Sequence, residues 1–270
     1  MEAVLPLLFP GFYPRRTMPT LPKHILLSDV DDTLLGDDPA TERFAAFVES
    51  NREKLAFVMN SSRFVASQKR SLQETALPEP DLLIGGMGTE IKLPAGGSRL
   101  PGAQKLADAW KAKHAAGWDV VKVVGVLDRF PGIEPQPEEN QSAFKQSRYL
   151  RGASEEDVAA LRGELADVGL DARVTYSSDR DLDVTPAGAD KSTAVRFVLD
   201  SLGYADADAA VAGDSGNDRA MLTCGARAIV VANHRPELAG LEGKNVFRAS
   251  KGHADGVVEG LLHWFPDLRP

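Results

Sequence analysis

Carboxylates gather directly after the first strongly apolar stretch of this 270-residue chain. Residues 25–30 have the composition of a buried parallel strand, and Asp29, Asp31 and Asp32 lie at its end. Because side chains alternate along a strand, Asp29 and Asp31 can point to one place beyond its carboxyl end, where open α/β sheets bind ligands. Two like charges at one place indicate either a bound cation or two carboxyl groups with different pKa values.

Two other interpretations of this acidic segment are a plain turn and a calcium loop. Aspartate favours turns, so these residues alone leave the plain turn open. A calcium loop that starts at Asp29 needs glycine at its sixth position and glutamate at its twelfth, where the chain has Leu34 and Ala40. The calcium loop is therefore excluded. A carboxylate pair beside Thr33 can instead supply a nucleophile and an acid–base group.

A second polar group follows the next predicted strand. Ser61 and Ser62 lie between a strand over residues 55–59 and a helix over residues 64–76. Hydroxyl and amide groups at a strand-to-helix junction suit an oxyanion or phosphate, but serine is also a common helix cap. Both interpretations remain open from these residues.

Two more polar groups occur late in the chain. Lys191 lies at the start of a predicted helix over residues 192–202, where the helix dipole disfavours a cation. The lysine is therefore either solvated or close to an anion. Asp214 and Asp218 follow a predicted strand over residues 209–212, and Asp218 falls in the first turn of the next helix, where a carboxylate is favoured.

Composition limits the class of protein. The chain is 43% hydrophobic and 26% charged, with a formal net charge of −8 and no lysine- or arginine-rich face, so nucleic acid is not expected as the main partner. The single cysteine, Cys224, favours a reducing compartment, and we expect a cytoplasmic protein. An apolar segment at residues 4–9 is too short and too proline-broken for a signal peptide or a membrane span.

The patterning predicts an α/β fold, a Rossmann-like doubly wound parallel-sheet core with an inserted α+β cap domain. We expect a loose extension over residues 1–22, a core over 23–94 and 179–270, and a cap over 95–178. The cap is expected to contain a helix over 103–115, an extended segment over 120–127, a loop over 129–140, strands over 145–151 and 172–176, and a helix over 154–168. The core is expected to resume with a strand over 182–185. Trp110 and Trp118 are expected in the core of the cap, and His114 on its surface.

Four motifs in this order resemble the haloacid dehalogenase superfamily of phosphatases. The motifs are Asp29-Val-Asp-Asp-Thr33, Ser61 with Arg63, Lys191, and Gly213-Asp-x-x-x-Asp218, each at a strand end or helix start on one edge of the sheet. Residues 87–91 and 181–186 further resemble the branch of sucrose-phosphate phosphatases and their relatives that act on mannosylfructose phosphate. The second motif departs from the usual pattern, since Ser61-Ser62 stands where Thr-Gly is usual.

The resemblance implies an aspartyl-phosphate mechanism. Asp29 would attack phosphorus, and Asp31 would protonate the leaving sugar oxygen and then deprotonate the attacking water. Magnesium (Mg²⁺) would be held by the Asp29 carboxylate, the Asp31 carbonyl and Asp214. A phosphosugar mutase of the same fold would use the same motifs, and a non-catalytic sugar-phosphate-binding regulator is a further alternative.

The resemblance also implies how the substrate is held. Ser61, the Ser62 amide, Asn217 and Lys191 would neutralise the phosphoryl oxygens, with Asp218 orienting Lys191.

The sugar would contact the cap. Gln146 and Arg148 on the predicted cap strand, with Glu90 facing the same cleft, would bind the sugar of a small-molecule sugar phosphate. A disaccharide phosphate carrying its phosphate on a fructosyl unit is the expected substrate. The oligomeric state is not determined by the sequence.

Overall fold

The computed structural model of the protein describes residues 21–270. The predicted loose extension, with its apolar segment, lies outside the described residues except for Leu21 and Pro22. The carbonyl of Pro22 accepts a hydrogen bond of 2.8 Å from the Tyr204 hydroxyl, so this end of the chain contacts the core. Across residues 21–270, no helix has both the length and the apolar character that crossing a membrane requires.

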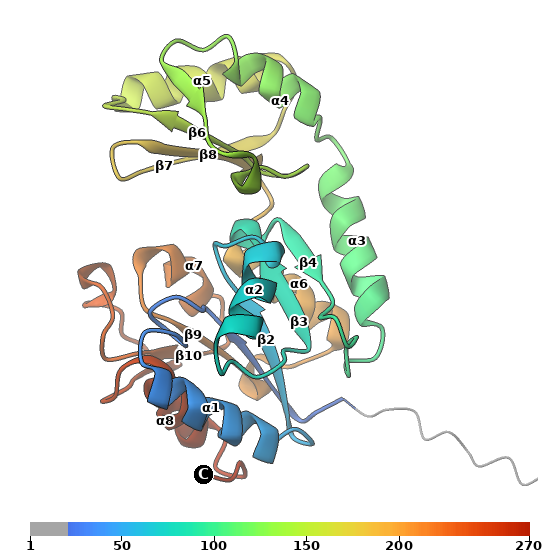
Figure 1. Cartoon of the computed structure of the whole chain (residues 1–270), viewed down its shortest axis with the longest axis vertical. Coiled ribbons are helices and arrows are strands. Elements are labelled where there is room, and N and C mark those ends of the chain that lie inside the picture. Colours follow the sequence, from blue (N-terminus) through green and yellow to red (C-terminus); the bar gives the residue numbers. More distant parts are fainter. Residues whose placement is uncertain (1–20) are drawn as a thin grey trace, which may run out of the picture.

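The larger of two sheets forms the core domain (Figure 1). Its seven strands run in the order β11-β10-β9-β1-β2-β3-β4, and all neighbouring pairs are parallel except β3 with β4. The strands are β1 His24–Ser28, β2 Leu55–Asn60, β3 Leu82–Gly85, β4 Glu90–Lys92, β9 Ala209–Gly213, β10 Arg227–Val230 and β11 Val246–Arg248. The predicted doubly wound sheet is therefore confirmed.

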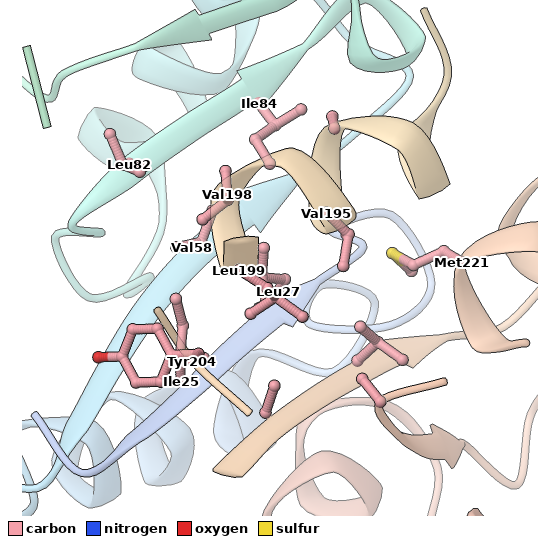
Figure 2. Close-up of a cluster of buried hydrophobic side chains, with 14 of the residues drawn as sticks. Ile25, Leu27, Val58, Leu82, Ile84, Val195, Val198, Leu199, Tyr204 and Met221 are labelled. Carbon is pink, nitrogen blue, oxygen red and sulfur yellow. The ribbon is translucent and has the colours of Figure 1, made fainter. Parts of the chain in front are cut away.

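Helices cover both faces of this sheet. They are α1 Asp38–Ser50, α2 Val65–Glu74, α3 Ala103–Ala115, α6 Lys191–Leu202, α7 Arg219–Leu222 and α8 His253–Trp264. On one face Leu27 of β1 packs in a cluster with Val195 and Val198 of α6 (Figure 2). On the other face Leu26 lies in a cluster with Phe44 of α1. Because β1 is buried on both faces, its register is fixed, and its carboxyl end holds Asp29 at the sheet edge.

The smaller sheet forms the cap domain. Its four strands run antiparallel in the order β5-β6-β8-β7. The cap elements are α4 Val120–Leu127, β5 Ile133–Pro135, β6 Gln146–Leu150, α5 Glu155–Asp167, β7 Ala172–Ser177 and β8 Asp181–Pro186. Helices α4 and α5 cover one face of the sheet, and the other face is directed toward the core domain (Figure 1).

The predicted boundaries of the cap were wrong at both ends. Strand β8 belongs to the cap sheet, although residues 182–185 were expected to resume the core. Its alternation of buried Leu182 and Val184 with half-buried Asp181 and Asp183 is typical of an antiparallel strand with one polar face. Helix α3 was expected in the cap but packs in the core cluster through Leu106.

Helix α4 also differs from the expectation, since residues 120–127 were predicted to be extended. The Asp119 carboxylate caps this helix by accepting from the backbone N–H groups of Val121 and Lys122 at 2.9 and 3.2 Å. Val123, Val126 and Leu127 are buried at helical spacing, and Val121 is exposed. Burial of one helical face therefore outweighs the strand preference of β-branched residues.

The expectations for Trp110 and His114 were wrong as well. Trp110 lies in the core-domain cluster and donates from its indole nitrogen to the carbonyl of Gly88 at 3.0 Å. His114 is buried with its ring edge-on to Trp110, at 4.2 Å between ring centroids. Trp118 packs against the cap cluster as expected. The burial of Trp110 and His114 depends on which domain α3 packs against, and the amphipathic pattern of the helix does not specify that domain.

Candidate active site

Asp29 is anchored at the carboxyl end of β1. Its backbone N–H donates to the carbonyl of Ala212 on β9 at 2.9 Å, and its own carbonyl accepts from the Ser28 hydroxyl at 2.7 Å. The carboxylate is 4% exposed and accepts a hydrogen bond of 2.6 Å from the Lys191 ammonium. Burial raises the pKa of Asp29 to about 7, because desolvation outweighs the attraction of Lys191.

Lys191 begins α6 and reaches back into the site with its side chain. Its ammonium donates to Asp29 at 2.6 Å, to Asp218 at 2.7 Å and to the amide oxygen of Asn217 at 3.3 Å. Burial by itself would lower the pKa of Lys191, but the carboxylates of Asp29 and Asp218 outweigh it and hold the pKa above its usual value. The solvated alternative is therefore wrong: these two carboxylates are the anions near Lys191.

Asp218 holds Lys191 in place. One of its carboxylate oxygens accepts from Lys191, and the other accepts from the backbone N–H groups of Asp214 and Ser215, each at 3.2 Å. This packing needs space at Gly213, where a Cβ atom would lie 2.6 Å from the Asp218 side chain. The glycine before Asp214 therefore allows the carboxylate to fold back under the strand end.

Asp214 completes the acidic cluster and contacts the hydroxyl of Thr33, a residue to which the sequence assigned no role of its own. The Thr33 hydroxyl lies 3.1 Å from an Asp214 oxygen and 3.3 Å from an Asp29 oxygen, so it bridges the two strand ends. Burial, together with the charge of Asp218, raises the pKa of Asp214. Thr33 lies four residues after Asp29, directly after the acidic residues. This position was the only feature of the sequence that could have assigned Thr33 to the site.

Three carboxylates of this site could hold a metal ion. Asp29, Asp214 and Asp218 each offer an oxygen atom, and these oxygens all lie within 4.8 Å of one another. The donor set of oxygens suits Mg²⁺, and a cation would relieve the cost of burying these charges. Asp218 already accepts three hydrogen bonds, one from Lys191 and two from backbone N–H groups, so Asp29 and Asp214 are the better ligands. The Asp31 carbonyl remains a predicted ligand.

The predicted phosphate-binding serines lie beside this cluster. Ser61 follows β2, is fully buried, and accepts from the backbone N–H of Arg63 at 3.1 Å through its hydroxyl oxygen. Its hydroxyl hydrogen is therefore free to donate to an added anion. Ser62 is half-buried and lines the cavity between core and cap. The helix-cap alternative for these serines is wrong, because Phe64 holds the cap position of α2 and no side chain caps it.

Asp31 lies apart from the buried carboxylates. Its side chain is 39% exposed and both of its oxygens accept from the guanidinium of Arg63, one of them at 2.8 Å from Nε. The predicted acid–base group is thus at the rim of the site, within a bidentate ion pair.

The polar face of the cap sheet closes the other side of a cavity of about 400 Å³. Lys145, Ser147 and Asp183 point into it, with Ser62 and Arg63 on the core side. Asp183 accepts from Ser147 at 2.6 Å and pairs with Lys145 at 2.9 Å. The ammonium of Lys145 also lies 5.3 Å from the ring centroid of Phe64, so it spans the two domains.

The structure does not place Gln146 and Arg148 in this cavity. The Arg148 guanidinium donates to the Gln146 amide oxygen at 3.3 Å and lies 3.8 Å from Asp128 at the end of α4, so both side chains face the helices of the cap. Alternation along β6 explains the difference, because Leu150 commits the even-numbered positions to the apolar face. Glu90 lies in a neighbouring hollow, where its carboxylate accepts from the Val65 N–H at 3.2 Å.

This core, with its inserted cap and its acids at the ends of β1 and β9, has the fold of the haloacid dehalogenase superfamily of phosphatases. A haloacid dehalogenase-like hydrolase from Bacillus subtilis superposes with a TM-score of 0.65 at 17% identity over 90% of this chain and 92% of its own, which supports the fold alone. Residues 22–265 match the sequence model described as sucrose-6F-phosphate phosphohydrolase, and the chain belongs to that family. It is therefore a phosphoric monoester hydrolase, as the resemblance predicted.

Several characterised relatives resemble the chain over most of its length. A mannosylfructose-phosphate phosphatase of Agrobacterium fabrum is 36% identical over 90% of this chain and 97% of its own. Sucrose-phosphatase 1 of Nicotiana tabacum is 30% identical over 89% of this chain, which spans 59% of the tobacco protein. A sucrose-phosphatase of Synechocystis, solved with sucrose and phosphate, has a TM-score of 0.76 at 25% identity, covering 90% of this chain and 98% of its own.

Proposed function

We propose that this protein is a Mg²⁺-dependent phosphatase of a phosphorylated disaccharide such as sucrose 6-phosphate or mannosylfructose phosphate. The names of its relatives support this substrate class, and a polar cavity between core and cap offers room for the sugar. The single cysteine supports the further proposal that the enzyme works in a reducing compartment such as the cytoplasm.

Asp29 would act as the nucleophile. One carboxylate oxygen attacks phosphorus, the bond from phosphorus to the sugar oxygen breaks, and an aspartyl-phosphate forms. Asp31 donates a proton to the leaving sugar oxygen and then removes a proton from the water that hydrolyses the intermediate. The contact of Asp29 with Lys191 supports this assignment, because it fixes the carboxylate and favours its ionised form.

The phosphoryl oxygens would be neutralised by groups that follow β2 and β9 and by the lysine at the start of α6. Lys191, Asn217, the Ser61 hydroxyl and the Ser62 amide are the proposed donors, and Asp218 keeps Lys191 in position. Donors that are fixed before the reaction stabilise the charge of the transition state without reorganisation at that moment.

Magnesium would be held by Asp29, Asp214 and the Asp31 carbonyl. When bound, it would offset the negative charge of the phosphoryl group as it meets the acidic cluster. The raised pKa values of Asp29 and Asp214 support a cation at this place, because the charged forms are costly to bury without one.

The cap residues Lys145, Ser147 and Asp183 would contact the sugar. Ammonium, hydroxyl and carboxylate groups match the donor and acceptor pattern of vicinal sugar hydroxyls. Contacts to the non-reacting part of the substrate can raise the rate at phosphorus, so the cap is expected to favour disaccharide phosphates.

The observation that carries this proposal is the placement of Asp29 between a buried lysine and a second acid at the end of a parallel strand. Phosphate release from sucrose 6-phosphate, mannosylfructose phosphate and glucose 6-phosphate tests it. We expect turnover that needs Mg²⁺, stops with a chelator, and favours a disaccharide phosphate by at least ~10-fold in specificity constant.

The Asp29→Asn variant should be folded and inactive in the same assay. Full activity after exhaustive chelation would contradict the metal assignment, and near wild-type turnover by Asp29→Asn would contradict the nucleophile. Conversion of a sugar 1-phosphate to its 6-phosphate would instead indicate a mutase.

A further inference from the structure

Arg63 fixes the side chain of the proposed acid–base group, Asp31, in a bidentate ion pair. Its Nε atom donates to one oxygen of Asp31 at 2.8 Å, and its Nη2 atom donates to the other. The remaining Nη1 atom donates to the Ser71 hydroxyl on α2 at 3.0 Å. The bidentate pair uses one lone pair on each carboxylate oxygen and fixes the direction of the Asp31 side chain at the rim of the site.

The pair differs from the other ion pairs of the site in its exposure. The side chains of Arg63 and Asp31 are each 39% exposed, whereas Lys191 is 2% exposed among its carboxylates. Exposed pairs contribute little net stability, whereas a buried charge that loses its partner is costly. Breaking a contact of Lys191 without replacing it is therefore costly, whereas the contact of Arg63 with Asp31 can be exchanged at little cost.

Alternative partners for Arg63 lie directly across the cavity. Asp181 and Asp183 of cap strand β8 line the same cavity of about 400 Å³ as Arg63, and each of their side chains is 27% exposed. Asp181 pairs with Arg180 at 2.9 Å and Asp183 pairs with Lys145 at 2.9 Å, so either carboxylate would share or exchange its partner on meeting Arg63. Both residues line this cavity together with Ser62 and Arg63 of the core, so their strand positions are on the face of the cap sheet that is directed toward the core. Closing the cap would bring a carboxylate to the guanidinium and compensate the loss of Asp31.

We propose that Arg63 is a positioning residue that withholds the Asp31 carboxylate while the cap is open and releases it by pairing with the carboxylates of β8 when the cap closes. This inference rests on the proposed function, since it assigns Asp31 to proton transfer. Its consequence is selectivity: a phosphate ester too small to contact the cap meets an Asp31 that is still held by Arg63.

The test compares the specificity constants for a small aryl phosphate and for sucrose 6-phosphate in Arg63→Gln and in the wild type. We expect the ratio of aryl to disaccharide activity to rise about fivefold, which corresponds to about 1 kcal/mol. Arg70→Gln is the matched control, because Arg70 lies in the adjoining cavity on α2 and makes no ion pair among residues 21–270. If the only effect were the loss of a positive charge, both variants would lose activity toward both substrates in parallel. Such a parallel loss would overturn the inference, and so would an unchanged ratio in Arg63→Gln.

A second variant and a background substitution separate positioning from general damage. Ser71→Ala removes one anchor of Arg63 without changing charge and should shift the ratio in the same direction as Arg63→Gln. In an Asp31→Asn background Arg63→Gln should leave the rate of the first step with the aryl phosphate, measured as the initial burst of released phenol, unchanged, because the residue acts only through Asp31. A burst rate that still changes would contradict this.

A binding experiment keeps the inference independent of turnover. In the Asp29→Asn protein with Mg²⁺, the Nε–H signal of Arg63 in a nitrogen NMR spectrum should move when sucrose 6-phosphate saturates the site. It should stay in place with inorganic phosphate alone, which cannot bridge to the cap. If the signal does not move when sucrose 6-phosphate saturates the site, Arg63 does not exchange its partner and the inference is wrong. Failure of the proposed function is a different result: the wild-type protein would release no phosphate from any ester.

Discussion

Lys191 balances two buried carboxylates, so its removal is expected to affect the fold as well as the chemistry. Lys191→Met leaves Asp29 and Asp218 buried without their cationic partner, and loss of one member of such a pair costs about 3 kcal/mol or more. Urea unfolding in the absence of metal measures this loss. Adding Asp29→Asn to Lys191→Met should recover part of the stability, because one of the two unpaired charges is then absent. A double variant no more stable than Lys191→Met would contradict this account.

The raised pKa of Asp29 predicts how stability changes with pH. Its folded value of about 7 lies above the ordinary value of 3.8, so between these two pH values the folded protein binds more protons than the unfolded chain. The free energy of unfolding of the metal-free protein should therefore fall as pH rises from 4 to 7, and Asp29→Asn should lack this part of the slope. Magnesium should raise the melting temperature more at pH 8 than at pH 5, because protons compete for the same carboxylate. Equal increases in melting temperature at the two pH values would show that Asp29 does not bind the metal.

The sequence indicated most of the buried charges because strand ends and helix starts are local features. Asp29, Lys191, Asp214 and Asp218 were each recognisable at such a position, and the parallel sheet brings them together. The pairing of Asp31 with Arg63 was not foreseen, since it depends on side-chain directions at the rim of the site.

At the scale of elements, strand β6 decides which cap residues face the substrate. Lys145 and Ser147 lie on its polar face, and Gln146 and Arg148 lie on the face covered by helices. The sequence contained this information in the apolar residue Leu150, which fixes the face of every second position. The earlier interpretation relied on the sugar-binding character of arginine and amide groups and gave no weight to this alternation.

A pair of substitutions on β6 tests the two faces. Lys145→Ala should lower the specificity constant for a disaccharide phosphate by ~10-fold and leave turnover of a small aryl phosphate nearly unchanged, because the ammonium would contact the sugar and takes no part in the proposed chemistry at phosphorus. Gln146→Ala is the matched control and should leave this selectivity in place. The reverse result, with selectivity lost in Gln146→Ala alone, would restore the original assignment of the sugar contacts.

Two further elements show why pattern alone placed the cap boundaries incorrectly. Residues 120–127 are rich in valine, which favours strands, yet capping by Asp119 and a buried helical face make them α4. Strand β8 is as short as a core strand, and the alternation of Leu182 and Val184 with aspartates marks its half-buried sheet. In both cases tertiary packing selects between local preferences of similar strength.

At the scale of the whole molecule, the two domains are joined by the segments at residues 116–119 and 187–190, and the cavity between them is polar. Closing the cap would exclude bulk water from the site and add contacts to the sugar, so we predict that the cap closes over a disaccharide phosphate. Small-angle X-ray scattering of the Asp29→Asn protein with Mg²⁺ should show a smaller radius of gyration when sucrose 6-phosphate is added. Inorganic phosphate at saturation should produce little change, because it cannot contact the core and Lys145 of the cap together. Calorimetry on the same sample shows when the disaccharide phosphate fully occupies the site. If the radius of gyration stays constant at full occupancy, the cap does not move, and the substrate binds in the cavity without any closure.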